Sequence, residues 1–403
     1  MRNVLFLAHR LPYPPDKGDK IRSWHFLQHL AASHRVHLGC LLDDPEDRRH
    51  LPRLERICAS VHAVEIRPGL RSLVSLRGVL TDEPLTFPYC ADRRLAAWVR
   101  GLAHETRLDL AFAYSSGMAP LVAPGALDVP RRVVDLVDLD SEKWRLYGAE
   151  AGGPMGWVWR REARCLAAAE AAIAGWADAT LLVSAAEVAD LRRRPGVPAE
   201  RVACVGNGVD LAAFDPSRPW PLPYPTLADG APLLVFTGAM DYRPNVDAVV
   251  WFADAVLPRI QALCPAVRFA VVGTRPTHAV RRLGDRPGVV VTGRVPDVRP
   301  WLAHATLAVA PLRIARGVQN KVLEAMAMAR PVLCTPAAAA GIEAVAGRDL
   351  AVAEGADAFA GAAEALLNDP SRRQALGAAA RRRVETAYDW RLKLAELDRV
   401  LVA

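Results

Sequence analysis

The chain has 403 residues, is 52% hydrophobic and carries a formal net charge of +7. This length exceeds what one ordinary hydrophobic core supports, so we expect two domains. The basic excess is modest and spread over both halves of the chain, which argues against a nucleic-acid-binding protein. The seven cysteines form no Cys-x-x-Cys pair, which predicts buried thiols in a reducing compartment rather than disulfides or a zinc site.

The sequence shows no targeting or membrane-spanning pattern. The apolar run within residues 1–9 is too short for a signal peptide. No stretch approaches the roughly 18 uncharged apolar residues that a spanning helix needs. We therefore expect a cytoplasmic protein, and the mild positive charge leaves open a peripheral contact with the inner face of the plasma membrane.

Short apolar runs alternate with helical patterns through the first half of the chain. The runs with strand character are 4–9, 36–42, 61–66, 109–115, 131–138, 179–184 and 201–205. Helical spacing marks segments between them, for example 20–32, 93–103, 155–175 and 185–194. Such alternation predicts a parallel sheet covered by helices on both faces.

A proline-rich segment separates this pattern from a second one like it. Residues 215–225 contain five prolines, which exclude a helix or a central strand. The alternation then restarts, with strand candidates at 233–238, 267–273, 289–293, 305–311, 331–335 and 350–353. The prediction is an α/β fold of two doubly wound, Rossmann-like domains facing a cleft, with ligands at the carboxyl ends of the strands.

The predicted boundaries follow from the linker and from the end of the chain. We expect an N-terminal domain over 1–215, a linker over 216–230, a C-terminal domain over 231–386 and a separate final helix over 387–403. The arginine-rich segment 372–402 is helical in pattern, with an aromatic interruption at Tyr388-Asp389-Trp390.

The segment 317–332 carries the most informative polar pattern in the chain. It joins the strand-like run 306–312 to a helix, and Gly317 opens the joint. A helix start preceded by glycine offers free backbone N–H groups and a positive dipole end, which suit a phosphate. Lys321 adds charge there, and Glu324 lies three residues on, facing the same side and able to accept hydrogen bonds from a ribose diol. These residues predict a metal-free site for a nucleotide diphosphate.

The loop after the first strand carries a second set of candidates. In residues 9–22, Gly18 would let the backbone approach a ligand, and Lys20 or Arg22 would meet a phosphate. The alternative is a solvated turn with charges at a helix start. The loop lacks the pattern Gly-x-Gly-x-x-Gly, which disfavours a dinucleotide site of the dehydrogenase type.

Three carboxylates, Asp135, Asp138 and Asp140, end another strand. One of them would orient a sugar hydroxyl or act as a base. The alternative is that Asp140 or Ser141 caps a helix, and both roles are compatible. Too few further ligands surround them to predict a metal site. Ser116, in a turn after the preceding strand, would line the acceptor side, although a plain turn is favoured there.

Glycines also end two strands of the second half. Gly238 follows the first of them, with Arg243 as a possible phosphate contact and Asn245 as an N-cap by residue type. After a later strand, the backbone turn at Arg294 and Val295 can bind a flat base. Helix 155–175 is rich in Trp and Arg and would suit a membrane surface, but an ordinary helix packed on the sheet is favoured.

Three motifs together resemble one family. They are Asn320-Lys321-Val322-Leu323-Glu324-Ala325-Met326, Val205-Gly206-Asn207-Gly208-Val209-Asp210, and Gly293-Arg294-Val295. The chain resembles the GT-B glycosyltransferases of family 4 over nearly its whole length. The segments 10–22 and 135–144 resemble one subgroup, the sugar transferases associated with PEP-CTERM and exopolysaccharide systems.

The resemblance implies a retaining, metal-independent hexosyltransferase that needs no cofactor and takes a nucleotide-diphosphate sugar as its substrate. The acceptor would be a glycan or a lipid-linked glycan in exopolysaccharide biosynthesis, bound by the N-terminal domain, and the last helix would cross back onto that domain. Glu324 would hold the ribose, Lys321 with the Gly317–Asn320 turn the diphosphate, and the backbone at Val295 the base.

The chain departs from the family pattern in places that matter for catalysis. Arg316 stands where the family has an acidic residue facing the donor sugar. Arg243 is a displaced substitute for a usual Arg-and-Lys pair, and Asp138 stands near a usual His. Asp138, Lys321 and Arg243 are therefore the candidate catalytic residues, with Arg316 as a further group near the diphosphate.

Two other functions remain open from the sequence. A sugar-nucleotide epimerase of the same fold would need several ionisable groups around the sugar. A catalytically silent partner that binds nucleotide or glycan within a polysaccharide complex would explain the missing acid at Arg316.

Overall fold

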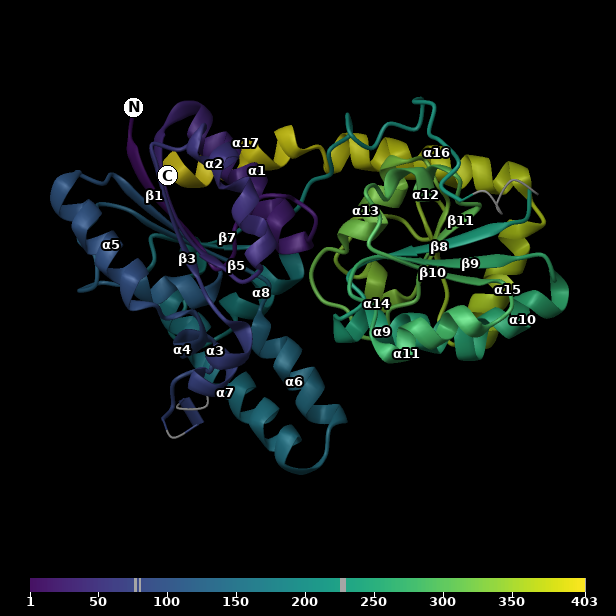
Figure 1. Ribbon diagram of the computed structural model, residues 1–403, viewed down its shortest axis with the longest axis horizontal. Coiled ribbons are helices and arrows are strands. Elements are labelled where there is room, and N and C mark those ends of the chain that lie inside the picture. The colour runs from purple at the N-terminus through teal and green to yellow at the C-terminus, as the bar shows by residue number, and fades with distance from the viewer. Residues whose placement is uncertain (76–77, 80, 225–229, 403) are drawn as a thin grey trace. The chain divides into compact units, whose positions relative to one another are not determined.

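The computed structural model describes residues 1–75, 78–79, 81–224 and 230–402, so residues 225–229 of the expected linker lie outside the described part. The chain divides into two compact units (Figure 1). Unit 1 comprises Met1–Gly206 and Leu394–Ala403, and unit 2 comprises Asn207–Lys393. Each unit is built around one parallel sheet, which confirms the predicted pair of Rossmann-like α/β domains.

Unit 1 contains a seven-stranded sheet of order β3-β2-β1-β4-β5-β6-β7, with all neighbours parallel. Its strands are β1 Asn3–Ala8, β2 Arg35–Leu42, β3 Ser60–Glu65, β4 Leu110–Tyr114, β5 Arg132–Val137, β6 Ala179–Leu182 and β7 Val202–Cys204. Each coincides with a predicted run to within about two residues, because a strand buried on both faces is apolar throughout.

Helices cover both faces of this sheet, as the alternation along β1 shows. Phe6 stacks on Phe112 of β4 with ring centroids 5.1 Å apart, and Phe26 meets Phe112 edge-on from the same side. Leu7 points to the opposite face, where it joins the core cluster that includes Leu95. Helix α1 (Gly18–Ser33), which carries Phe26, and helix α5 (Arg93–Glu105), which carries Leu95, therefore lie on opposite faces.

The other helices of unit 1 are α2 Leu51–Glu55, α3 Pro68–Ser75, α4 Thr86–Cys90, α6 Asp140–Glu150, α7 Gly153–Trp176 and α8 Ala185–Arg192. Short 3-10 helices occur at Pro45–His50, Ser116–Leu121 and Ala199–Arg201. Helices α6 and α7 form a hairpin that extends away from the sheet (Figure 1). The C-terminal part of α7 buries Leu166 and Ile173, which confirms the prediction of a packed helix there.

Unit 2 contains a six-stranded parallel sheet of order β10-β9-β8-β11-β12-β13. Its strands are β8 Leu233–Thr237, β9 Arg268–Val272, β10 Val289–Gly293, β11 Leu307–Ala310, β12 Val332–Cys334 and β13 Ala351–Val352. Its helices are α9 Arg243–Trp251, α10 Leu257–Leu263, α11 His278–Arg281, α12 Arg299–Ala303, α13 Asn320–Ala327, α14 Pro336–Ala339, α15 Ala356–Leu367 and α16 Pro370–Ala387. A π-helical turn, Phe252–Val256, joins α9 to α10, and a 3-10 turn, Arg282–Asp285, follows α11.

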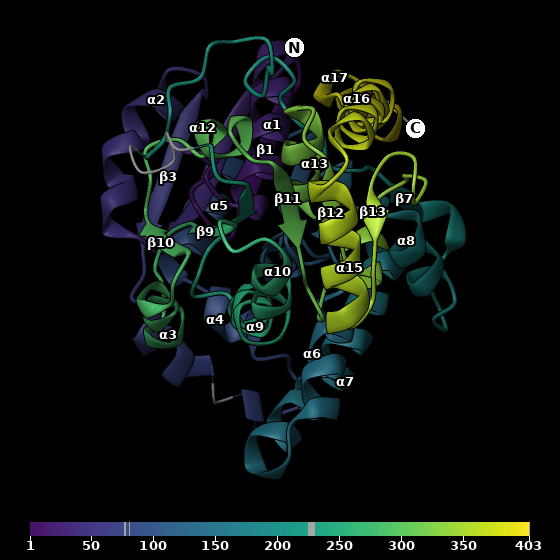
Figure 2. The same ribbon diagram turned by 90° about the vertical axis from the view of Figure 1, so that its right-hand side faces the viewer.

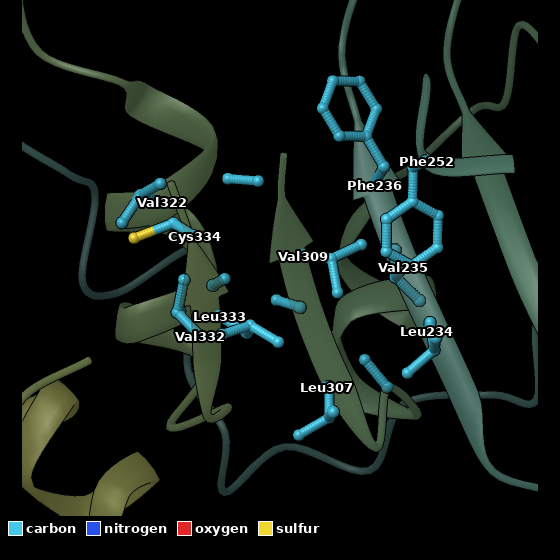
Figure 3. Packing of buried hydrophobic residues seen from close by; sticks show 14 of the residues in the cluster. Leu234, Val235, Phe236, Phe252, Leu307, Val309, Val322, Val332, Leu333 and Cys334 are labelled. Atoms are coloured by element: carbon cyan, nitrogen blue, oxygen red, sulfur yellow. The ribbon is translucent and has the colours of Figure 1, made fainter. Parts of the chain in front are cut away.

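Helices α9, α10 and α11 lie on one side of this sheet, and α12, α13 and α16 lie on the other (Figures 1 and 2). The apolar side chains of β8, β11 and β12 form the centre of the core, with Val322 of α13 beside them (Figure 3). Phe252 packs on Phe269 with ring centroids 4.5 Å apart and meets Phe359 of α15 edge-on.

Tyr388-Asp389-Trp390 interrupts the last helices as predicted, because α16 ends at Ala387 and α17 runs from Trp390 to Val402. Within unit 2, the Val209 amide donates to the Tyr388 carbonyl at 2.7 Å, and a side chain at Gly208 would collide with Trp390. The end of α17 belongs to unit 1, where Asp398 pairs with His29 at 2.6 Å.

One close backbone approach holds the ends of β8 and β9 together. A Cβ at Gly273 would lie 1.6 Å from the Gly238 carbonyl oxygen. We expect Gly273→Ala to destabilise the protein by about 1–3 kcal/mol, because the two strand ends must separate. As a control, Gly361→Ala in α15 meets no atom within 4 Å and should stabilise by about 0.5–1 kcal/mol. Equal midpoints of urea denaturation for the two variants would contradict this account.

Candidate functional site

The sheet of unit 2 changes direction between β8 and β11. The chain runs outward from β8 through β9 to β10 on one side, and from β11 through β12 to β13 on the other. At such a switch point the loops that follow the two central strands diverge and leave room for a ligand at their carboxyl ends. Helix α9 begins after β8, and helix α13 begins after β11, so both helix N-termini lie at this edge.

Lys321, in the first turn of α13, reaches across the switch point to β8. Its ammonium nitrogen donates to Asn245 Oδ1 of α9 at 2.5 Å and lies 4.4 Å from the centroid of the Phe236 ring. Asn245 Nδ2 in turn donates to the Ala239 carbonyl at 2.8 Å. A Cβ at Gly238 would lie 3.3 Å from Lys321 Nζ and 2.7 Å from Asn245 Nδ2, so glycine is needed where β8 ends.

The electrostatics of Lys321 prepare it for an anion. Burial lowers the pKa of Lys321 to about 7, and the neighbouring Glu324 carboxylate only partly opposes the shift. With Glu324 as its neighbouring negative charge, the Lys321 ammonium group therefore loses its proton easily near pH 7. A phosphate close to the nitrogen would favour the charged form, so binding of an anion and protonation of Lys321 would support each other.

Glu324 lies one turn further along α13 and is half-buried. Burial raises the pKa of its carboxyl to about 7, and Lys321 opposes this rise. Within the described part of the chain, the Glu324 carboxylate makes no hydrogen bond or ion pair with another side chain or with the backbone. Two closely spaced acceptor oxygens thus stand ready for a ligand with adjacent hydroxyl groups.

The N-terminus of α13 is open to an anion as well. No side chain caps this helix, and its first turn contains no acidic residue. Asn320 is held from outside by Asn207, whose Nδ2 donates to Asn320 Oδ1 at 3.0 Å. Gly317 adopts a left-handed conformation with φ of +62°, and a side chain at Gly341 would collide with its carbonyl oxygen.

The remaining predicted residues of unit 2 lie at neighbouring positions. Arg243 is the first residue of α9, and Arg316 is half-buried in the loop before α13. Arg294 follows the left-handed Gly293 at the end of β10, and the Val295 side chain packs against the core, which leaves its backbone at the turn. These placements are compatible with ligand contact, and their predicted roles stay predictions.

The structure corrects the prediction for Asn245. Tyr242 occupies the N-cap position of α9, and Asn245 is the third helical residue. Its amide holds Lys321 instead of capping the helix. Residue type alone suggested a cap, while the contact with Lys321 depends on a residue 76 positions away. The sequence analysis did not single out Gly273 or Gly341 and named Asn207 only within the motif 205–210, because their contacts depend on tertiary packing.

In unit 1, Lys20 and Arg22 do not offer their charge to a ligand. Lys20 is buried and pairs with Asp47. Arg22 is fully buried; its Nε donates to Asp135 Oδ2 at 2.7 Å and its Nη1 donates to the Val205 carbonyl at 2.7 Å. The predicted phosphate contacts are thus replaced by ion pairs that join α1 to the 3-10 helix Pro45–His50 and to β5, and Gly18 begins α1.

The turn after β5 brings Asp138 to the carboxyl edge of the sheet in unit 1. Its Oδ1 is buried without a hydrogen-bond partner among the described residues. Burial raises the pKa of Asp138 to about 6, and the adjacent Asp140 carboxylate adds to the rise. The predicted cap is wrong, because Leu139 occupies the N-cap position of α6 without a side-chain cap.

Ser116 is buried in the 3-10 helix that follows β4. Ser115 Oγ accepts a hydrogen bond from the Gly117 amide at 3.2 Å and caps this helix, and the acceptor-side role of Ser116 stays a prediction. Among the described residues, no group of three His, Cys, Asp or Glu side chains is placed to hold a metal ion. No helix in the described ranges is long and apolar enough to cross a membrane.

The pH dependence of stability tests the buried position of Glu324. Its carboxyl has a pKa of about 7 in the folded chain, above the ordinary value of 4.5. Its contribution to stability is therefore present below pH 4.5 and is lost as pH rises through about 7. We expect Glu324→Gln to gain melting temperature relative to the parent chain between about pH 5 and pH 8. Glu364→Gln on α15 is the control. If the melting temperature of Glu324→Gln relative to the parent changes as little with pH as that of the control, the burial of Glu324 is contradicted.

The chain is similar to known proteins in both sequence and structure. Residues 231–369 match the family described as "Glycosyl transferases group 1". No curated protein matches the sequence.

Solved structures share the whole fold. Sucrose-phosphate synthase from Thermosynechococcus elongatus has 18% identity and a TM-score of 0.74, over 100% of this chain and 99% of that one. Anabaena HepE in complex with UDP and glucose has 17% identity and a TM-score of 0.71, over 100% of both chains. The glycosyltransferase WaaG has 18% identity and a TM-score of 0.66, over 98% of this chain and 99% of that one. The chain therefore has the GT-B fold, and its segment 231–369 carries the sequence pattern of group 1 glycosyl transferases.

Proposed function

We propose that the protein is a glycosyltransferase that moves a sugar from a nucleotide-diphosphate donor to a glycan or lipid-linked acceptor. The observation that carries the proposal is the arrangement at the switch point of unit 2. Two helical turns of α13 contain an uncapped N-terminus, the Lys321 ammonium group and the Glu324 carboxylate. The N-terminus and the ammonium group suit a diphosphate, and the carboxylate suits the hydroxyl groups of a ribose.

The residues take separate roles in this proposal. The backbone N–H groups that open α13 and the Lys321 ammonium bind the diphosphate, and Glu324 accepts hydrogen bonds from the ribose hydroxyls. Arg243 and Arg316 are further contacts for the phosphates, and the backbone of Arg294 and Val295 binds the base. Complexes of HepE with UDP and with UDP-glucose support this assignment by likeness of fold.

The chemistry follows from charge development on the leaving group. When the bond between the anomeric carbon and the diphosphate oxygen breaks, negative charge grows on that oxygen. In this proposal Lys321 and the helix N-terminus face that oxygen before the bond breaks, so they stabilise the transition state without reorganising. The acceptor oxygen bonds to the anomeric carbon, and its proton leaves with the diphosphate or solvent. Retention of configuration, metal independence and a role in exopolysaccharide biosynthesis are parts of the proposal that rest on resemblance.

A panel of nucleotide sugars tests donor binding. The matching donor at about 100 times its dissociation constant should add about 2.7 kcal/mol to the free energy of unfolding. Glu324→Ala should lose most of this gain, because the ribose loses its acceptors, whereas Glu364→Ala should keep it. Full stabilisation of the Glu324→Ala protein by the same donor would remove the site assignment.

Turnover assays separate the alternatives. An isomerised donor in the absence of acceptor would show an epimerase. Tight donor binding with neither sugar transfer nor slow donor hydrolysis would show a catalytically silent partner.

Peripheral membrane contact is proposed for the hairpin of α6 and α7. At its tip, Met155 is 56% exposed and Trp157 is 52% exposed. Residues 143–164 contain five basic and two acidic residues; Arg161 and Glu162 are buried, which leaves four basic residues and one acidic residue toward an anionic lipid surface. The hairpin is firm below the tip, where Arg160 donates to the Gly148 carbonyl at 2.9 Å. An indole and a thioether on such a support would enter the interfacial layer of a bilayer.

Vesicle sedimentation tests this contact. The protein should bind vesicles that contain anionic phospholipid and bind phosphatidylcholine vesicles weakly, since both charge and apolar insertion are required. The double variant Met155→Ser, Trp157→Ser should lose at least about tenfold in affinity. Leu263→Ser, which changes an exposed leucine of unit 2, is the control. Equal binding of the double variant and the control would exclude the hairpin tip.

A further inference from the structure

The backbone between Asp135 and Ser141 has an unusual conformation. Val137 adopts φ of +68°, a left-handed conformation that a β-branched residue rarely takes. The Asp138 amide donates to the Leu136 carbonyl at 2.9 Å, which closes a tight turn around Val137. The pairing of β5 with β6 shifts register at the same place, between Asp135 and Val137.

Three carboxylates hold this turn by its alternate amides. Asp135 Oδ1 accepts from the Val137 amide at 3.0 Å, and Glu187 Oε1 accepts from the Leu139 amide at 3.1 Å. Glu170 Oε1 accepts from the Ser141 amide at 3.0 Å. These acceptors come from β5, α8 and α7 respectively, so three elements of the chain fix one turn.

Each carboxylate is itself anchored. Arg22 holds Asp135 from α1, and Arg194 Nη1 donates to Glu170 Oε2 at 2.7 Å. Glu187 is buried at the start of α8, where Ser184 Oγ donates to Glu187 Oε2 at 3.4 Å. Burial of charge on this scale is costly unless the geometry is fixed. A simple helix cap would have required one exposed Ser or Asp.

The residue that this turn presents is Asp138. We propose that Glu187 and Glu170 are positioning residues, which keep Val137 in its left-handed conformation so that the Asp138 carboxylate can accept a hydrogen bond from a hydroxyl of the sugar substrates. The inference rests on the proposed glycosyl transfer and adds to it the residues that set the geometry of Asp138. Asp138 is half-buried, and its Oδ1 has no hydrogen-bond partner among the described residues, so this oxygen is not committed to another group of the chain.

The charges around Asp138 define its pH dependence. Asp140 and Lys143 face it from α6, Arg22 from α1 and Asp135 from β5, and the Tyr114 hydroxyl of β4 lies in the same group. Lys143 and Arg22 oppose the rise in the pKa of Asp138, and Asp140 and Asp135 add to it. Because the carboxylate form accepts the hydrogen bond, transfer should increase as pH rises through about 6.

The test removes one of the acceptors that hold the turn. Glu187→Ala leaves the Leu139 amide without its acceptor, so the turn is free to leave the left-handed conformation that valine disfavours. This variant should lower kcat about 10- to 100-fold with little change in donor KM. It should also move the acidic limb of the pH profile toward the ordinary value for a carboxyl group. Val137→Gly, in which residue 137 adopts positive φ freely, should keep the limb in place and lose much less activity.

Two controls separate positioning from folding. Ala329→Gly relieves a positive φ of +53° in unit 2 and should leave kcat and the pH profile unchanged. Glu187→Gln keeps an oxygen for the Leu139 amide and should rescue most of the activity that Glu187→Ala loses. Parent values of kcat and of the pH limb in Glu187→Ala, or equal losses in Val137→Gly, would overturn the inference.

A readout without turnover keeps this test apart from the proposed function. The raised pKa of Asp138 gives stability that is lost as pH rises through about 6. The melting temperature of Asp138→Asn relative to the parent should therefore rise between about pH 4 and pH 7. The same comparison in a Glu187→Ala background should be flatter. If no sugar is transferred but the melting temperatures follow these expectations, the turn positions Asp138 and the proposed glycosyl transfer is wrong. If the melting temperature of Asp138→Asn relative to the parent does not change with pH, the inference about the turn is wrong.

Discussion

Unit 2 depends on the contacts of the Lys321 ammonium group, which lies between Asn245 and the ring of Phe236. It joins α13 to α9 and to β8 at the one place where the sheet changes direction. This arrangement requires Gly238 at the end of β8, since a side chain there would collide with both Asn245 and Lys321. The contacts that pack unit 2 therefore also set the position and the lowered pKa of the Lys321 ammonium group.

Unit 1 uses buried charge differently. The Arg22–Asp135 pair has no exposed surface and connects the first helix to the fifth strand. Removing one partner of such a pair leaves an uncompensated charge and costs about 3–5 kcal/mol. Glu170 and Glu187 extend this arrangement to the turn that carries Asp138. Charged residues here fix backbone geometry, whereas in unit 2 the Glu324 carboxylate makes no hydrogen bond or ion pair within the described part of the chain.

The secondary structure was predictable from the sequence because each element has a strong local signature. Strands buried on both faces are apolar throughout, so β1 and β8 could be located to within a residue or two. The α13 motif was also found from sequence, since the glycine joint, Lys321 and Glu324 are close along the chain. The roles of Lys20, Arg22 and Asn245 were not, because each depends on a partner 27 to 113 residues away.

The sequence by itself determined two Rossmann-like sheets and the polar motif after β11, because periodicity and short-range spacing carry that information. Tertiary structure alone decided which charges remain available. It neutralised Arg22 with Asp135, placed Asn245 against Lys321 and forced Val137 into a left-handed turn. The physical reason is that burial and pairing set the energy of a charged group, and both depend on residues brought together from distant parts of the chain.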